Sequence, residues 1–140
     1  MTDIQTAKEN LAGHTVCLVK GESIIKSTKR GVAPLLEFID GGGDFSGFSA
    51  ADKIVGKAAA LLYARLGVKE VYAEVMSRPA EQVFKAQNIM YSYGAVAEKI
   101  INSKGDGVCP MEEAVENISS PREAVTAIKN KLKLISGGNF

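Results

Sequence analysis

The chain has 140 residues, of which 46% are hydrophobic and 24% are charged, and its formal net charge is +1. This length suits one domain with a buried core, so we expect a single domain over residues 1–140. The near-neutral charge and the lack of basic runs argue against nucleic-acid binding. No apolar run approaches the roughly 20 residues of a membrane helix, and the start MTDIQTAKEN is too polar for a signal peptide. We therefore expect a cytoplasmic protein without nucleic-acid or membrane partners.

Hydrophobic periodicity and turn residues predict the elements of the first part of the chain. They are a helix over 2–12, an antiparallel hairpin of strands over 14–21 and 22–29, and a helix over 32–40. A long helix is expected to begin after Ser49 and to end at Leu66, with Gly67 as its left-handed stop. Its expected core face carries Ile54, Val55, Ala58, Ala59, Leu61, Leu62 and Leu66, and its opposite face carries Asp52, Lys53, Gly56, Lys57, Ala60 and Tyr63.

The glycine- and serine-rich loop before this predicted helix indicates an anion site. Lys53 and Lys57 would be like charges four residues apart, which helix stability alone does not favour. An anion held by the loop amides, the helix N-terminus and both lysines would relieve that repulsion. The alternative is an ordinary solvated face in which Asp52 favours the helix dipole. Ala58 follows Gly56-Lys57 where a nucleotide P-loop has Ser or Thr, so that motif is rejected.

The second part of the chain predicts strands alternating with helices. The elements are a strand over 69–76, a helix from Pro79 to about Tyr93, a strand over 96–102, a short helix from Pro110 and a last helix from Pro121. This order predicts an α/β fold, a three-layer α-β-α sandwich whose mixed sheet is antiparallel at the hairpin and parallel beyond it. Asp52, Ser77 and Cys109 lie near predicted helix starts, where such folds bind ligands, so we infer one pocket.

Three runs of residues resemble a known family: DFSGFSAADKIVGKAAA (44–60), MSRPAEQV (76–83) and GVCPMEEAV (107–115). The chain is similar over nearly its whole length to an uncharacterised, domain-of-unknown-function family of small bacterial and archaeal proteins. That resemblance implies a cytidine-deaminase-like fold and carries no established activity. Zinc deaminases hold their metal with H-x-E and P-C-x-x-C motifs. Here Asp52 stands closest to the first position, no His-x-Glu occurs, and Pro79-Ala80-Glu81-Gln82-Val83 lacks both cysteines, so neither zinc nor another cofactor is expected.

Cys109 is the candidate nucleophile or redox thiol, because it would precede the first residue of the helix from Pro110, where backbone amides favour a thiolate. Asp52 or Glu112 would carry the proton. The alternative is a half-buried turn residue, while Cys17 is expected in a buried strand.

Three functions follow from these patterns. The leading one is a zinc-free, deaminase-like protein that binds a small anionic molecule or nucleotide. The second is an enzyme that depends on Cys109, and the third is a non-catalytic self-association module that forms a homo-oligomer. The predicted ligand-binding residues are Ser46, Gly47, Ser49, Lys53, Lys57 and Ser77.

Overall fold

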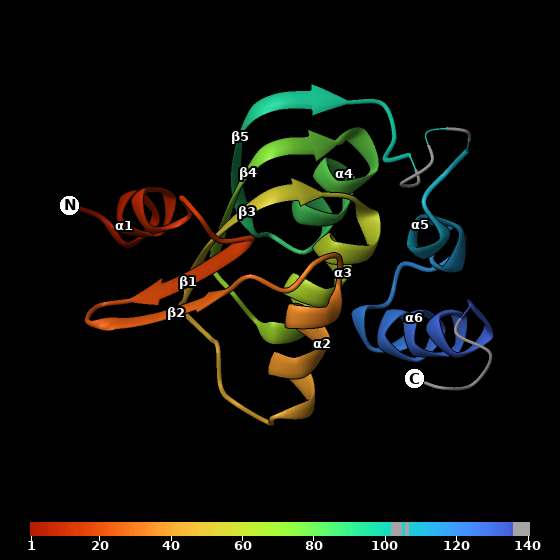
Figure 1. The fold of residues 1–140 in the computed structure, drawn as a ribbon, viewed down its shortest axis with the longest axis horizontal. Coiled ribbons are helices and arrows are strands. Elements are labelled where there is room, and N and C mark those ends of the chain that lie inside the picture. The colour runs from red at the N-terminus through yellow and green to blue at the C-terminus, as the bar shows by residue number, and fades with distance from the viewer. Residues whose placement is uncertain (102–104, 106, 136–140) are drawn as a thin grey trace.

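The computed structural model describes residues 1–101, 105 and 107–135, and it is built around a five-stranded mixed sheet (Figure 1). The strand order is β2-β1-β3-β4-β5, in which β3, β4 and β5 are parallel and β1 is antiparallel to both of its neighbours. The elements are α1 (Asp3–Asn10), β1 (Val16–Lys20), β2 (Ser23–Ser27), α2 (Ala33–Asp40), β3 (Ser49–Val55), α3 (Lys57–Leu66), β4 (Glu70–Ser77), α4 (Arg78–Ala86), β5 (Met90–Ala97), α5 (Pro110–Ala114) and α6 (Pro121–Ile135).

Helices cover both faces of the sheet. Helix α1 packs against β1, β3 and β4 on one face, whereas α3 and α4 lie on the other face, with α2 beside α3 (Figure 1). Helices α5 and α6 pack in turn against α3. The predicted α/β class, with helices on both faces of a mixed sheet, is therefore confirmed.

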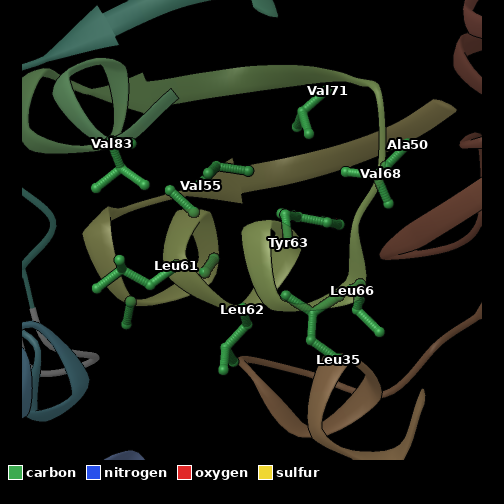
Figure 2. Packing of buried hydrophobic residues seen from close by; sticks show 14 of the residues in the cluster. Leu35, Ala50, Val55, Leu61, Leu62, Tyr63, Leu66, Val68, Val71 and Val83 are labelled. Atoms are coloured by element: carbon green, nitrogen blue, oxygen red, sulfur yellow. The ribbon is translucent and has the colours of Figure 1, made fainter. Parts of the chain in front are cut away.

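Helix α3 is the centre of the hydrophobic core. Leu61, Leu62 and Tyr63 have no exposed surface, and Figure 2 shows Tyr63 on the side of α3 that faces the sheet and Leu62 on the opposite side. Burying a large apolar side chain stabilises the fold by about 1.5–3 kcal/mol. The small residues Ala58 and Ala60 in the same helix are also buried and leave room for close packing. Helix α3 is buried on nearly every side because the sheet, α2, α4 and α6 surround it.

The predicted helix over 50–66 is wrong in its first half. Ser49 is not a helix cap but the first residue of the central strand β3, which pairs with β1 on one side and β4 on the other. Helix α3 begins only at Lys57, after Gly56. Ile54, expected in the core, is 55% exposed. Alanine and lysine favour helices, but pairing with two neighbouring strands overrides that local preference.

Tyr63 and Ala60 also differ from their prediction. Both were expected on an outward face, and both are fully buried, because α3 is enclosed by other elements rather than lying on the surface. The other residues expected in the core of the predicted helix are buried. They are Val55, which belongs to β3, and Ala58, Ala59, Leu61, Leu62 and Leu66 of α3.

The boundary between α4 and β5 is likewise corrected. Helix α4 ends at Ala86 rather than near Tyr93, and Asn88 adopts a left-handed conformation with φ of 58° before β5 begins at Met90. Tyrosines and β-branched residues favour a strand here over a continued helix. The predicted strand over 96–102 overlaps β5 only at its start, and Asn102 lies outside the described residues.

The remaining predictions of secondary structure are confirmed. They are the first helix, the hairpin, the helix over 32–40, the strand over 69–76, and the helices that begin at Pro110 and Pro121. At the last helix, the Glu123 backbone N–H donates to Ser120 Oγ at 3.3 Å, a bond that satisfies a free amide of the first turn. Among the described residues, the helices are too short or too polar for any of them to cross a membrane.

Candidate functional site

A cavity of about 350 Å³ lies where β3 ends and α3 begins. This is the C-terminal edge of the parallel strands, where ligands bind in open α/β sheets. Its polar lining residues are Thr15, Arg30, Asp52, Lys53, Cys109 and Glu112. Its apolar lining residues include Val32, Ile54, Ala58, Ala59, Ile100 and Met111. The cavity thus joins β3 to the loop before α2, to the start of α3 and to α5.

Asp52 is the most buried polar side chain of this cavity. It is 8% exposed, and its Oδ2 accepts a hydrogen bond of 2.6 Å from the Tyr63 hydroxyl on α3. Its Oδ1 accepts a longer bond of 3.4 Å from the Ile54 backbone N–H. Burial raises the pKa of Asp52 to about 7, although these hydrogen bonds lower it. Burial and the adjacent carboxyl also raise the pKa of Tyr63 well above its ordinary value.

Glu112 fills the anion position at the start of α3. Its Oε1 accepts from the Lys57 backbone N–H and its Oε2 from the Ala58 backbone N–H, both at 2.8 Å. These amides have no partner within the helix, so a carboxylate satisfies them and favours the helix dipole. Gly56 permits the approach, because a Cβ on this residue would lie 2.5 Å from Glu112 Oε1. The chain itself thus supplies an anion at the observed start of α3, whereas the anion site was predicted at a helix start after Ser49, where β3 begins instead.

The two lysines of the predicted anion site point to different surroundings. Lys53 lines the cavity, and its Nζ lies 3.3 Å from Glu74 Oε2. Lys57 lies outside it and donates from Nζ to the Glu116 carbonyl at 3.1 Å. They do not form a pair on one helix, because Lys53 belongs to β3 and Lys57 to α3.

Cys109 lines the cavity from the position before α5. It is partly exposed, its N–H donates to the Ile100 carbonyl at 3.0 Å, and its own carbonyl accepts from the Glu112 N–H at 2.9 Å. The predicted N-cap position is confirmed, but α5 has only five residues. Cys17 is buried in β1 as predicted.

The remaining predicted ligand-binding residues lie away from the cavity. Ser46 and Gly47 lie beside Lys20, whose Nζ donates to the Ser46 carbonyl at 3.1 Å, in the loop before β3. Ser49 is fully buried, and its Oγ has no hydrogen-bond partner among the described residues. Ser77 caps α4 by accepting from the Ala80 N–H at 3.2 Å. The structure thus brings together Asp52, Lys53, Cys109 and Glu112 and leaves Ser46, Gly47, Ser49, Lys57 and Ser77 outside.

Sequence reasoning missed Arg30, Thr15 and Tyr63. Arg30 lies between the hairpin and Gly31, whose φ of 64° forms a turn, and this turn brings Arg30 to the cavity. The glycine was the one sequence signal for that turn. The Thr15 hydroxyl donates to the Ser27 and Lys29 carbonyls and holds this turn. Tyr63 was placed on the same predicted face as Asp52, yet the two side chains meet between a strand and a helix.

No group of three His, Cys, Asp or Glu side chains is arranged to hold a metal ion within the part of the chain that the structure describes. The expected lack of zinc stays a prediction.

The chain belongs to the DUF1893 family, whose model, described as a domain of unknown function (TM1506), matches residues 7–132. This confirms the resemblance to a family of unknown function. A crystal structure of a DUF1893 family protein (TM1506) from Thermotoga maritima is 24% identical, with a TM-score of 0.84. That match covers 94% of this chain and 91% of the other, and it shows a shared fold. A search of the curated proteins gave no match. Neither match names a cytidine-deaminase-like fold, so that assignment stays a prediction.

Proposed function

We propose that this chain binds a small anionic, nucleotide-like ligand in the cavity between β3, α3 and α5. The observation that carries the proposal is that a buried carboxyl group, Asp52, and two basic residues, Arg30 and Lys53, line one mainly apolar cavity. Ligand sites combine apolar walls with a few polar groups in this way, at volumes of about 300–1,000 Å³.

Positive charge at the exposed side of the cavity supports an anionic group on the ligand. Arg30 is exposed and makes no ion pair with any described residue. Arginine binds phosphate or carboxylate through two parallel hydrogen bonds. Glu112 is the other acidic residue of the lining, and both of its oxygens already accept from backbone amides. Its charge is therefore partly compensated within the protein.

A thermal-shift experiment tests this proposal. Inorganic phosphate and the four common ribonucleoside monophosphates should raise the melting temperature of the wild type, because a ligand selective for the native state stabilises it. The double variant Arg30→Ala, Lys53→Ala should lose the gain. Lys57→Ala is the matched control and should keep it, because Lys57 lies outside the cavity. An equal gain in the double variant would place the anion elsewhere.

A second candidate function is a cysteine-dependent enzyme. It is favoured by the presence of Cys109 and Asp52 in the lining of one cavity. Iodoacetamide should then alkylate Cys109 faster than it alkylates free cysteine under the same conditions. A rate no faster than that of free cysteine, with ligand binding unchanged in Cys109→Ser, would leave Cys109 as a structural residue.

A further inference from the structure

Asp52 keeps unused hydrogen-bonding capacity inside the cavity. An ionised carboxylate offers about four acceptor positions on its two oxygens. Tyr63 occupies one position on Oδ2, and the Ile54 N–H makes a long contact with Oδ1. The nearby Lys53 N–H also lowers the pKa of Asp52, but it donates its hydrogen bond to the Thr15 carbonyl at 3.3 Å. Each oxygen therefore retains an acceptor position. A buried carboxyl group that accepts too few hydrogen bonds is unfavourable, so a ligand with matching donors gains from binding here.

No cation in the described part of the chain pairs with Asp52. Among the described residues, it takes part in no ion pair within 4.0 Å, while the neighbouring Lys53 pairs with Glu74. The group that faces Asp52 from α3 is the neutral hydroxyl of Tyr63. Asp52 is therefore suited to accept hydrogen bonds from neutral N–H groups of a ligand. Its raised pKa of about 7 leaves it mainly ionised, with two acceptor oxygens, at a mildly alkaline pH.

The polar groups of the cavity follow an order from inside to outside. Asp52 is buried, Lys53 is partly exposed and Arg30 is exposed, while Val32, Ile54 and Met111 supply apolar walls. A flat heterocycle matches this order if its faces contact the apolar walls, its N–H edge meets Asp52 and its anionic substituent reaches Arg30. Purines with a 2-amino group beside a ring N–H present two adjacent donors, one for each carboxylate oxygen.

We propose that Asp52 determines the specificity of this cavity by binding the paired N–H donors of a guanine-like base, whose phosphate lies toward Arg30. This inference rests on the proposed ligand-binding function and names the class of its ligand. The proposed contact with Asp52 distinguishes guanine from hypoxanthine, because hypoxanthine keeps the ring N–H and lacks the 2-amino group. A site built to hydrogen-bond a donor rejects the analogue that lacks it.

Isothermal titration calorimetry at a mildly alkaline pH tests the inference with guanosine and inosine monophosphates. The wild type should bind guanosine monophosphate about 10-fold or more tightly than inosine monophosphate, because one hydrogen bond to a charged acceptor is lost with the amino group. In Asp52→Asn, which replaces one acceptor by a donor, the ratio should fall to near one. Arg30→Ala should weaken both ligands and leave the ratio unchanged.

Each other outcome decides against one or both of the two proposals. If the wild type binds the two nucleotides with equal affinity, the proposed role of Asp52 is wrong, and no variant is needed to show it. An unchanged preference in folded Asp52→Asn would do the same. Phosphate stabilisation that depends on Arg30, without binding of either purine nucleotide, would leave the proposed function standing and reject this inference. If no phosphate or nucleotide binds at all, both proposals fail.

Discussion

The Asp52–Tyr63 pair is a buried hydrogen-bonded contact between β3 and α3. A carboxyl group that is 8% exposed accepts a 2.6 Å hydrogen bond from a fully buried tyrosine, and it lies in a strand next to a cavity. Burial disfavours the charged form, which raises the pKa of Asp52. Perturbed carboxyl groups in cavities are characteristic of functional sites, although structural networks also produce them.

Asp52 should make the stability of the protein depend on pH. Its pKa is about 7 in the native state against the ordinary 3.8, so between these values the native state holds the extra proton. The free energy of unfolding therefore falls as pH rises from about 4 to about 7, by about 4 kcal/mol in total. Asp52→Asn does not ionise and should remove this fall. Urea unfolding at about pH 5 and about pH 8 should record about 3 kcal/mol of this fall, because the rest of it lies below pH 5.

Asp44→Asn is the control for this experiment. Asp44 is fully exposed, and hydrogen bonds from Ser46 lower its pKa, so this variant should retain the wild-type fall between the two pH values. A wild-type stability that does not change over this range, or the same slope in Asp52→Asn, would contradict the buried-carboxyl interpretation.

At the scale of elements, the sequence predicts most helices and strands but misses strand β3 and misplaces the boundary between α4 and β5. Glycine and proline residues at helix ends predict α2, α5 and α6, and the alternation of apolar and polar residues predicts the hairpin. Strand β3 was missed because its alanines and lysine favour a helix locally, whereas the pairing with β1 and β4 that holds it is non-local. The candidate site depends on that pairing. The sequence therefore predicts Asp52, Cys109 and Glu112 as site residues. It does not predict that Tyr63 contacts Asp52 or that Arg30 lines the same cavity.

The contact of Glu112 with the start of α3 should be sensitive to a methyl group on Gly56. The added Cβ of Gly56→Ala would lie 2.5 Å from Glu112 Oε1 and 2.9 Å from Ile100 Cγ1, so the carboxylate must move away from the amides. We expect a loss of about 1–3 kcal/mol in the free energy of unfolding. Glu112→Ala should cost a similar amount, and chemical denaturation measures both.

A double-mutant cycle distinguishes this mechanism from simple crowding. The variant Gly56→Ala, Glu112→Ala should cost less than the sum of the single changes, because both remove the same interaction. Additive costs would show that Gly56 acts independently of Glu112. Glu113→Ala serves as the matched control. Its carboxylate lies 3.8 Å from Lys131 Nζ at the surface, and the change should cost about 0–1 kcal/mol.

At the scale of the whole molecule, the C-terminal helices complete both the core and the cavity. Helix α6 buries Ala124 and Ile128 against α3, and α5 supplies Met111 and Glu112 to the cavity wall. The packing of α5 and α6 onto α3 therefore connects the stability of the fold to the geometry of the site. The predicted self-association stays a prediction.

Ile128→Ala should test the packing of the C-terminal helices. Ile128 is fully buried, so the truncation should lower the free energy of unfolding by about 2–5 kcal/mol through lost burial and the cavity that it leaves. Leu134→Ala on the same helix should change it by no more than about 0.5 kcal/mol, because Leu134 is 79% exposed. Similar effects of the two substitutions in urea unfolding would contradict the docking of α6.

The location of the ligand is tested most directly by the alkylation rate of Cys109, because this thiol lines the cavity while Cys17 is buried in β1. The rate should be measured by mass spectrometry with and without a saturating concentration of the nucleoside monophosphate that raises the melting temperature most. Alkylation of the buried Cys17, measured in the same samples, reports any unfolding of the protein. A ligand in the cavity should slow the alkylation of Cys109 several-fold or more. An unchanged rate, at a concentration that does raise the melting temperature, would place the ligand elsewhere and contradict the proposed function of this cavity.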